Sequence, residues 1–143
     1  MVLVCEYAMR TGQHALAFML TASCYRMVRL LGLDSEARYT DLRTPRNATQ
    51  AESECRLLWS CYTLDSFIGS GVDGNLHWKE DAPHMPMPCS ESDFVSQIRR
   101  PAKTKLYMIN IVLDSNYPSL ADLRSNIIVL ARFRTRVLRL AQP

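Results

Sequence analysis

ESECRLLWSCYTLD, residues 52 to 65, lies at the centre of the longest helix that the sequence predicts. Apolar residues recur here every three or four positions, the spacing of one helix face. We expect a helix from about Thr49 to Ile68, with Thr49 as its N-cap and Glu52 in capping-box spacing. Glu52 can also pair with Arg56 one turn later. The expected apolar face, with Trp59 and Tyr62 at its edge, comprises Leu58, Cys61, Leu64, Phe67 and Ile68.

Two helical patterns precede this segment. The first spans about residues 2 to 9, and a break at Thr11-Gly12 separates it from a second over about residues 13 to 31. Gly32 supplies a left-handed stop after the last turn, with Leu33 as the accompanying hydrophobic contact. Residues 34 to 49 lack apolar periodicity and predict a surface connection. The expected apolar face of the second helix comprises Leu16, Leu20, Met27 and Leu31.

Helical patterns of differing clarity follow the long helix. Three glycines end it, and a proline-rich connection extends to Ser92. Ser90 or Ser92 is expected to cap a short helix through Phe94, Val95 and Ile98, and a less certain helical stretch spans residues 102 to 114. The last helix, capped by Ser119, has a stripe that predicts packing against a partner helix. That stripe comprises Leu120, Leu123, Ile127, Leu130, Phe133, Val137 and Leu140.

These patterns predict an all-α fold. We expect a multi-helix array of five to six helices that forms part of a larger helical domain, since no convincing pair of strands appears. The 143 residues are enough for one domain, and 48% hydrophobic content is enough for a packed core. The 17 basic residues exceed the 14 acidic ones only slightly, so the net charge of +3 does not by itself predict nucleic-acid binding.

Cysteine usage and hydropathy indicate an intracellular chain. The five cysteines are far apart and form no Cys-x-x-Cys pair, as expected for reduced thiols. The apolar run from Ala15 to Tyr25 resembles the end of a signal peptide, but Glu6 and Arg10 precede it and the apolar pattern continues beyond it. No uncharged run approaches the ~18 residues that a membrane-spanning helix needs.

Catalytic and metal-binding motifs find little support. A metal site would have to use His77, His84 and Cys89 near Asp73 or Asp81, at spacings that match no compact ligand pair. The apolar register of Cys61 points its thiol inward, where it is inert packing. Gly69-Ser70-Gly71 has no following lysine and so is no phosphate loop. We therefore predict no enzyme, no catalytic residue, no metal ligand and no cofactor in this chain.

The final helix is rich in arginine. These residues are compatible with a nucleic-acid or import-receptor surface, but a solvated face opposite the leucine stripe is the simpler interpretation, because no aromatic residues are interleaved. The arginines are Arg124, Arg132, Arg134, Arg136 and Arg139.

Residues 52 to 65 closely resemble the signature helix of the fungal-specific transcription factor domain, the middle homology region of binuclear zinc cluster transcription factors. Further similarities to the family occur in the same order, at residues 22 to 33, 81 to 88 and 130 to 140. The chain departs from the family at Cys55 and Ser66, where arginine is usual, and at Leu58, where an aromatic residue is frequent. The matching signature positions, which we expect to be structural, are Glu52, Arg56, Trp59, Tyr62, Leu64 and Asp65.

The resemblance implies a regulatory function. Residues 1 to 143 would form part of the regulatory domain of a nuclear transcription regulator, without the zinc cluster. Zinc and DNA would be bound only by an absent N-terminal domain, so this chain should not read DNA itself. Its partners would be other helices of the parent regulator or a partner protein, and no membrane. The alternative is an effector-sensing helical module, whose small apolar ligand would lie in a pocket lined by Trp59, Phe67 and Phe133.

Overall fold

The computed structural model describes residues 1–35, 47–69, 75–78, 86–96 and 123–141. Within these ranges 76% of the residues are helical and no strand is present, which confirms the predicted all-α array. The helix predicted over residues 102 to 114 and the cap at Ser119 lie outside the described residues. The helices are α1 (Val2–Arg10), α2 (His14–Leu30), α4 (Ala48–Ile68), α5 (Glu91–Val95) and α6 (Leu123–Leu140).

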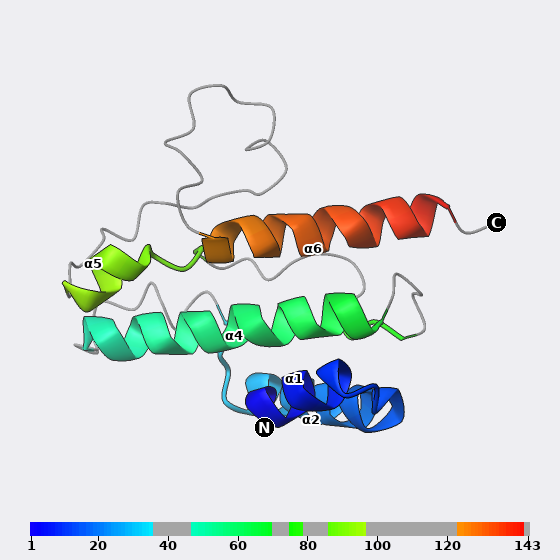
Figure 1. Ribbon diagram of the computed structural model, residues 1–143. Helices are drawn as coiled ribbons and strands as arrows, with labels where there is room; N and C mark the ends of the chain where they lie inside the picture. Colours follow the sequence, from blue (N-terminus) through cyan, green and yellow to red (C-terminus); the bar gives the residue numbers. More distant parts are fainter. Residues whose placement is uncertain (36–46, 70–74, 79–85, 97–122, 142–143) are drawn as a thin grey trace.

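Helix α4 lies at the centre of this arrangement (Figure 1). The pair α1 and α2 packs on one side of α4, and α6 packs on the other. Helices α4 and α6 run in the same direction, with the short α5 near the beginning of α4 (Figure 1). None of the described helices is long and apolar enough to cross a membrane.

Helices α1 and α2 form a tight antiparallel pair joined at Gly12, whose φ of 76° is left-handed. Small side chains fill the contact between them, and the thiol of Cys5 lies 2.9 Å from the hydroxyl of Thr21. The predicted apolar face of α2 is wrong, because its large side chains are mostly exposed. Small residues allow the two backbones to approach closely, so they occupy the interface instead. The buried residues of α2 are Ala17, Thr21, Cys24 and Val28.

The predicted stop after α2 is confirmed. Gly32 has φ of 62°, and the amide of Leu33 donates to the carbonyl of Val28 at 3.0 Å. This bond satisfies a carbonyl of the last turn, as in a Schellman motif. Leu33 folds back into the core, where only 3% of its surface remains exposed.

The N-cap of α4 is Asn47, and the prediction of Thr49 is wrong. The Asn47 side chain accepts a hydrogen bond from the amide of Thr49 at 3.0 Å. Asparagine in an extended conformation is as good a cap as threonine, so the helix begins two residues earlier than the capping-box spacing implied. Trp59 and Tyr62 also lie in the core and not at its edge, with 2% and 5% of their surfaces exposed.

Helices α5 and α6 depart from the sequence prediction in different ways. Ser90 caps α5 as expected, but the helix ends at Val95. Helix α6 buries Ile128, Ala131 and Thr135 against its neighbours. The predicted packing of the leucine stripe against a partner helix is therefore not found among the described residues. The stripe positions that the structure describes are exposed: Leu123, Ile127, Leu130, Phe133, Val137 and Leu140.

Candidate functional site

The candidate site is the face of α4 that holds the chain segments that follow it. We call the described residues 75–78 and 86–90 the connection, since they lie between α4 and α5. Five of the six signature residues contact the connection directly. Each of them lies on α4, so a single rigid helix sets their relative positions.

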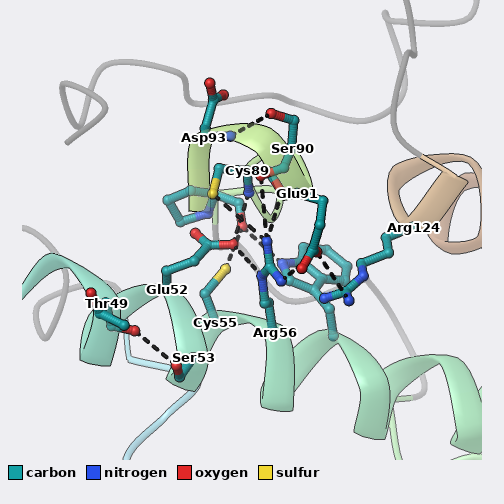
Figure 2. Close-up of polar contacts among 12 residues, drawn as sticks. Thr49, Glu52, Ser53, Cys55, Arg56, Cys89, Ser90, Glu91, Asp93 and Arg124 are labelled. Carbon is teal, nitrogen blue, oxygen red and sulfur yellow. Dashed lines mark hydrogen bonds and ion pairs between the residues drawn. The ribbon is translucent and has the colours of Figure 1, made fainter. Parts of the chain in front are cut away.

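Arg56 is the hub of the polar contacts at the beginning of this face (Figure 2). Its Nε donates to Glu52 at 2.9 Å, which confirms the predicted pair. Its Nη1 donates to Glu91 of α5 at 2.9 Å, and its Nη2 donates to the carbonyl of Cys89 at 3.3 Å. Only 12% of the Arg56 side chain is exposed. The guanidinium therefore joins α4, the connection and the start of α5.

Glu52 has a second function in the same cluster. Its Oε1 also accepts a hydrogen bond from the backbone amide of Cys89 at 2.9 Å, so it is not used in a capping box. Arg124 of α6 reaches Glu91 at 3.2 Å (Figure 2). Three charged pairs thus connect α4, α5 and α6 in one network.

The electrostatics of Arg56 favour its charged form. Burial works to lower the pKa of Arg56, but hydrogen bonds to Glu52 and Glu91 outweigh it and raise that pKa above the ordinary value. The guanidinium also lies 4.0 Å from the centroid of the Phe94 ring. A planar cation that is hydrogen-bonded and stacked in this way is a positioning group, and lysine would not replace it.

Trp59 anchors the middle of the connection. Its indole Nε1 donates to the carbonyl oxygen of Pro86 at 2.8 Å, and the thiol of Cys55 donates to the same oxygen at 3.2 Å. The Trp59 ring contacts Tyr62 edge to face at a centroid distance of 5.5 Å. Tyr62 in turn meets Trp78 of the connection at 6.0 Å. The rings of Trp59, Tyr62 and Trp78 therefore pack one after another along α4, and Trp59 also binds Pro86.

Asp65 fixes the first part of the connection. Its Oδ2 accepts hydrogen bonds from the backbone amides of His77 at 2.9 Å and Trp78 at 3.2 Å. Its Oδ1 lies 2.7 Å from Nδ1 of His77. The carboxylate is 2% exposed, so these partners replace the water it has lost. The His77 ring also packs against Tyr25 of α2.

The sixth signature residue faces the other way. Leu64 belongs to the small core cluster that also contains Cys5, Ala8 and Ala17, between α4 and the α1–α2 pair. The signature residues therefore stabilise both sides of α4, and only five of them build the contact with the connection.

The partners of these residues were the part that the sequence did not reveal. Glu91 belongs to no motif, and Pro86 is recognisable only as part of the proline-rich connection. His77 and Cys89 have the chemistry of metal ligands but no ligand spacing. The sequence favours a solvated face for Arg134, yet its Nη1 donates to the carbonyl of Ser66 at 3.1 Å. No local pattern could have identified these contacts, because they join residues 12 to 68 positions apart in the chain.

The residues considered as metal ligands contact other parts of the fold where the structure describes them. His77 is paired with Asp65 and Cys89 lies beside Arg56, while Asp73, Asp81 and His84 lie outside the described residues. In the described part of the chain no three His, Cys, Asp or Glu residues gather in a group that would hold a metal ion, so these residues do not fit a zinc cluster. Cys61 is buried as predicted, and burial raises its pKa to about 12, which keeps the thiol protonated.

The pocket expected for the alternative function is not formed as predicted. Trp59 is buried in the core and Phe133 is 64% exposed on α6. A hollow of about 410 Å³ instead lies beside Phe67, at the end of α4 that faces α1 and α2. Its lining comprises Met9, His14, Ala17, Phe18, Phe67 and Ile68.

Comparisons with known proteins give a consistent result. The family model described as "Fungal specific transcription factor domain" matches residues 1–141. The Zn(2)-C6 fungal-type transcription factor FTF1c of Fusarium oxysporum f. sp. lycopersici is 29% identical over 136 residues, which covers 85% of this chain and 14% of the relative. Transcription factor AN6788 of Emericella nidulans is 26% identical over 140 residues, or 97% of this chain and 21% of the relative.

The matched region is a small part of each relative. The chain spans about a seventh of FTF1c and about a fifth of AN6788. No solved structure shows a significant match to the chain.

Proposed function

The chain belongs to the family of fungal specific transcription factor domains, and from that premise we propose that it is the regulatory helical part of a zinc cluster transcription factor. Its family and relatives support a role in the regulation of transcription. In this proposal it acts inside a larger nuclear protein, does not read DNA itself, and catalyses no reaction. Zinc and DNA are bound by another part of that protein.

The observation that supports this proposal is the network around Arg56. Its contacts with Glu52, Cys89 and Glu91, extended by Arg124, join α4 to the connection, α5 and α6. Packed interfaces change between discrete arrangements and do not deform continuously. A network that joins several helices can therefore pass a change in the position of one helix to the others, as a regulatory domain requires.

The arginines of α6 support the proposal that the chain does not read DNA. Arg134 donates to the Ser66 carbonyl and stacks near Phe67, and Arg124 pairs with Glu91. Arginines held by protein groups in this way are poorly placed for phosphate contacts.

A reporter assay tests the regulatory role. The 143-residue chain, fused to an unrelated DNA-binding domain, should change reporter transcription relative to that domain alone, and Arg56→Leu should remove most of the change. Arg10→Leu is the matched control, since Arg10 makes an exposed pair with Glu6 that contributes little to stability. Equal effects of the parent chain and Arg56→Leu at equal protein levels would contradict the proposal.

DNA binding is tested separately. Fluorescence anisotropy with mixed-sequence duplex DNA should show only weak, salt-sensitive association, with Kd no tighter than about 10⁻⁵ M at physiological salt. Affinity in the nanomolar range for one sequence would show that the chain reads DNA and would overturn this part of the proposal.

Effector sensing remains a second candidate, and the hollow beside Phe67 favours it. His14 lines it and is exposed, so His14→Trp should fill the space without disturbing the close contact of α1 and α2. A small apolar ligand that raises the melting temperature of the parent chain should lose this effect in His14→Trp. Leu30→Phe on the same helix is the control, since Leu30 is 87% exposed and does not line the hollow.

A further inference from the structure

Three cysteines lie where α1, α2 and α4 pack together (Figure 1). Cys5 lies on α1, Cys24 on α2 and Cys61 on α4, and no more than 4% of the surface of any of them is exposed. The thiol of Cys5 acts electrostatically on both Cys24 and Cys61, so the three side chains are near one another. None of them contributes to the contacts of the candidate site.

Cys24 and Cys61 interact directly across the contact between α2 and α4. A side-chain hydrogen bond joins their thiols, and both residues belong to the same core cluster. Cys5 belongs to the neighbouring cluster, where its thiol lies 2.9 Å from the hydroxyl of Thr21 and donates to the carbonyl of Ala17 at 3.4 Å. The described residues add no third ligand that would hold a metal ion, so disulfide formation is the chemistry open to this pair.

The remaining two cysteines make other contacts. The thiol of Cys55 donates to the carbonyl oxygen of Pro86 at 3.2 Å, and the thiol of Cys89 lies 3.9 Å from Nη2 of Arg56. Cys55 precedes Cys61 by six residues on α4, which separates them by about 9 Å along the helix axis. Because Cα atoms more than about 7 Å apart cannot be bridged, an intact α4 prevents a disulfide between Cys55 and Cys61.

We propose that Cys24 and Cys61 form a redox-sensitive latch, in which oxidation by a hydroperoxide creates a disulfide between α2 and α4. In the first step one sulfur attacks hydrogen peroxide and becomes a sulfenic acid, and one molecule of water is released. In the second step the other sulfur attacks the sulfenic sulfur, the S–S bond forms and a second molecule of water leaves. The two thiols together lose two electrons and two protons, which reduce the peroxide to two molecules of water.

The packing of α2 on α4 controls this reaction. Burial raises the pKa of both thiols, that of Cys61 to about 12, so they stay protonated and shielded while the helices are packed. A brief separation of the helices exposes one thiol to the oxidant, and their return brings the second thiol against the oxidised sulfur. The bond then closes a long loop, which stabilises the chain and keeps α2 on α4. This inference goes beyond the proposed function and requires only the fold.

The test uses the intact 143-residue chain, hydrogen peroxide and peptide mapping under non-reducing conditions. After free thiols are blocked, the main crosslink should join Cys24 to Cys61, and dithiothreitol should remove it. The oxidised chain should melt about 5 °C or more above the reduced chain, since the crosslink constrains the unfolded state.

Oxidation in urea is the control for the native arrangement. In the unfolded chain the short loop between Cys55 and Cys61 closes more readily than the long loop between Cys24 and Cys61. The folded chain should therefore favour the crosslink from Cys24 to Cys61 at least about tenfold over that from Cys55 to Cys61, and the unfolded chain should reverse this order.

Matched variants separate the latch from general thiol chemistry. Cys61→Ala and Cys24→Ala should each abolish the main crosslink and the rise in melting temperature on oxidation. Cys55→Ala removes a buried thiol from the same helix as Cys61 and should keep both effects. The crosslink and the melting temperature are also measured in the parent chain, so the result does not depend on the folding of any variant.

Any of three results would overturn the inference. Peroxide could leave the five thiols unreacted, or produce mainly sulfinic acids or crosslinks between chains. The main crosslink of the folded chain could join another pair, such as Cys5 with Cys24 or Cys55 with Cys89. The bond between Cys24 and Cys61 could also form without raising the melting temperature, which would show that it strains the contact of α2 with α4 and does not hold it closed.

Discussion

Asp65 and His77 meet through two separate contacts, since one carboxylate oxygen accepts the His77 backbone amide at 2.9 Å and the other lies 2.7 Å from its ring nitrogen. The pair joins the last turns of α4 to the connection 12 residues farther along the chain. Because His77 also packs against Tyr25, the same contact reaches α2. One buried carboxylate therefore positions three segments.

Asp65→Asn should destabilise the fold by about 2–3 kcal/mol, because the amide weakens hydrogen bonds that a buried charge now strengthens. Urea unfolding followed by circular dichroism measures this change. Glu6→Gln, which alters an exposed pair with Arg10, should cost no more than about 0.5 kcal/mol. Equal effects of the two substitutions would mean that Asp65 does not anchor the connection.

Arg56→Lys should cost about 1–2 kcal/mol and Arg56→Ala about 3 kcal/mol or more. Lysine keeps the charge but cannot reach Glu52, Glu91 and the Cys89 carbonyl together, and alanine leaves the largely buried Glu52 without its cation. The measurement is again urea unfolding, with Arg10→Ala as the exposed control. A lysine variant as stable as the parent would refute a hub that depends on the planar guanidinium.

Gly69→Ala should destabilise the chain by about 1–3 kcal/mol through overpacking. A Cβ at Gly69 would lie 2.5 Å from Leu76 Cδ2 and 3.0 Å from the carbonyl oxygen of Asp65. Leu76 is buried, so it has little room to move. Adding Leu76→Ala should make the cost of Gly69→Ala smaller than it is in the parent background, as a double-mutant cycle would show. Strict additivity would argue against the contact.

Stability should fall as the pH rises above about 9. Burial raises the pKa of Cys55 and Cys61 to about 12. In the unfolded chain these thiols ionise near their ordinary pKa of 9.0, so between pH 9 and 12 the unfolded state loses protons that the folded state keeps. Each thiol then removes up to ~1.4 kcal/mol of stability per pH unit, and its contribution is fully present below pH 9.

Urea unfolding between about pH 8 and about pH 11 measures this loss. The Cys55→Ala, Cys61→Ala variant is the control, since it starts from lower stability but should show a shallower dependence on pH. Parallel curves for the two proteins would show that other groups, such as tyrosines and lysines, cause the decline.

The existence of α1, α2, α4 and α5 and the bounds of α1 and α2 were largely predictable from the sequence, because capping residues and glycine stops act locally. Gly32 and Ser90 are examples, and both have the expected function. The pair Glu52 and Arg56 was also predictable, since its spacing is one helical turn. The N-cap of α4 was predicted wrongly at Thr49, since Asn47 two residues earlier supplies it.

The buried faces were harder to predict, and α2 shows why. Its leucines and methionines mark the more hydrophobic side, but Ala17 and Thr21 permit the closest approach to α1. Helix α6 repeats this pattern, since Ala131 and Thr135 face inward while Leu130 is exposed. Periodicity identifies a face and says nothing about which neighbour covers it. The contacts of the signature residues with Pro86, Cys89 and His77 were beyond prediction for the same reason, since they depend on the tertiary path of the chain.

The cysteines have a practical consequence for following local motion. All five are buried with free thiols, and they are distributed over α1, α2, α4 and the connection. A thiol reagent can modify each of them only when the segment that covers it opens, so the rate of alkylation at each position reports a local opening free energy. Peptide mass spectrometry of the partly alkylated chain would thus rank the helices by how often they separate, and no probe residue has to be introduced.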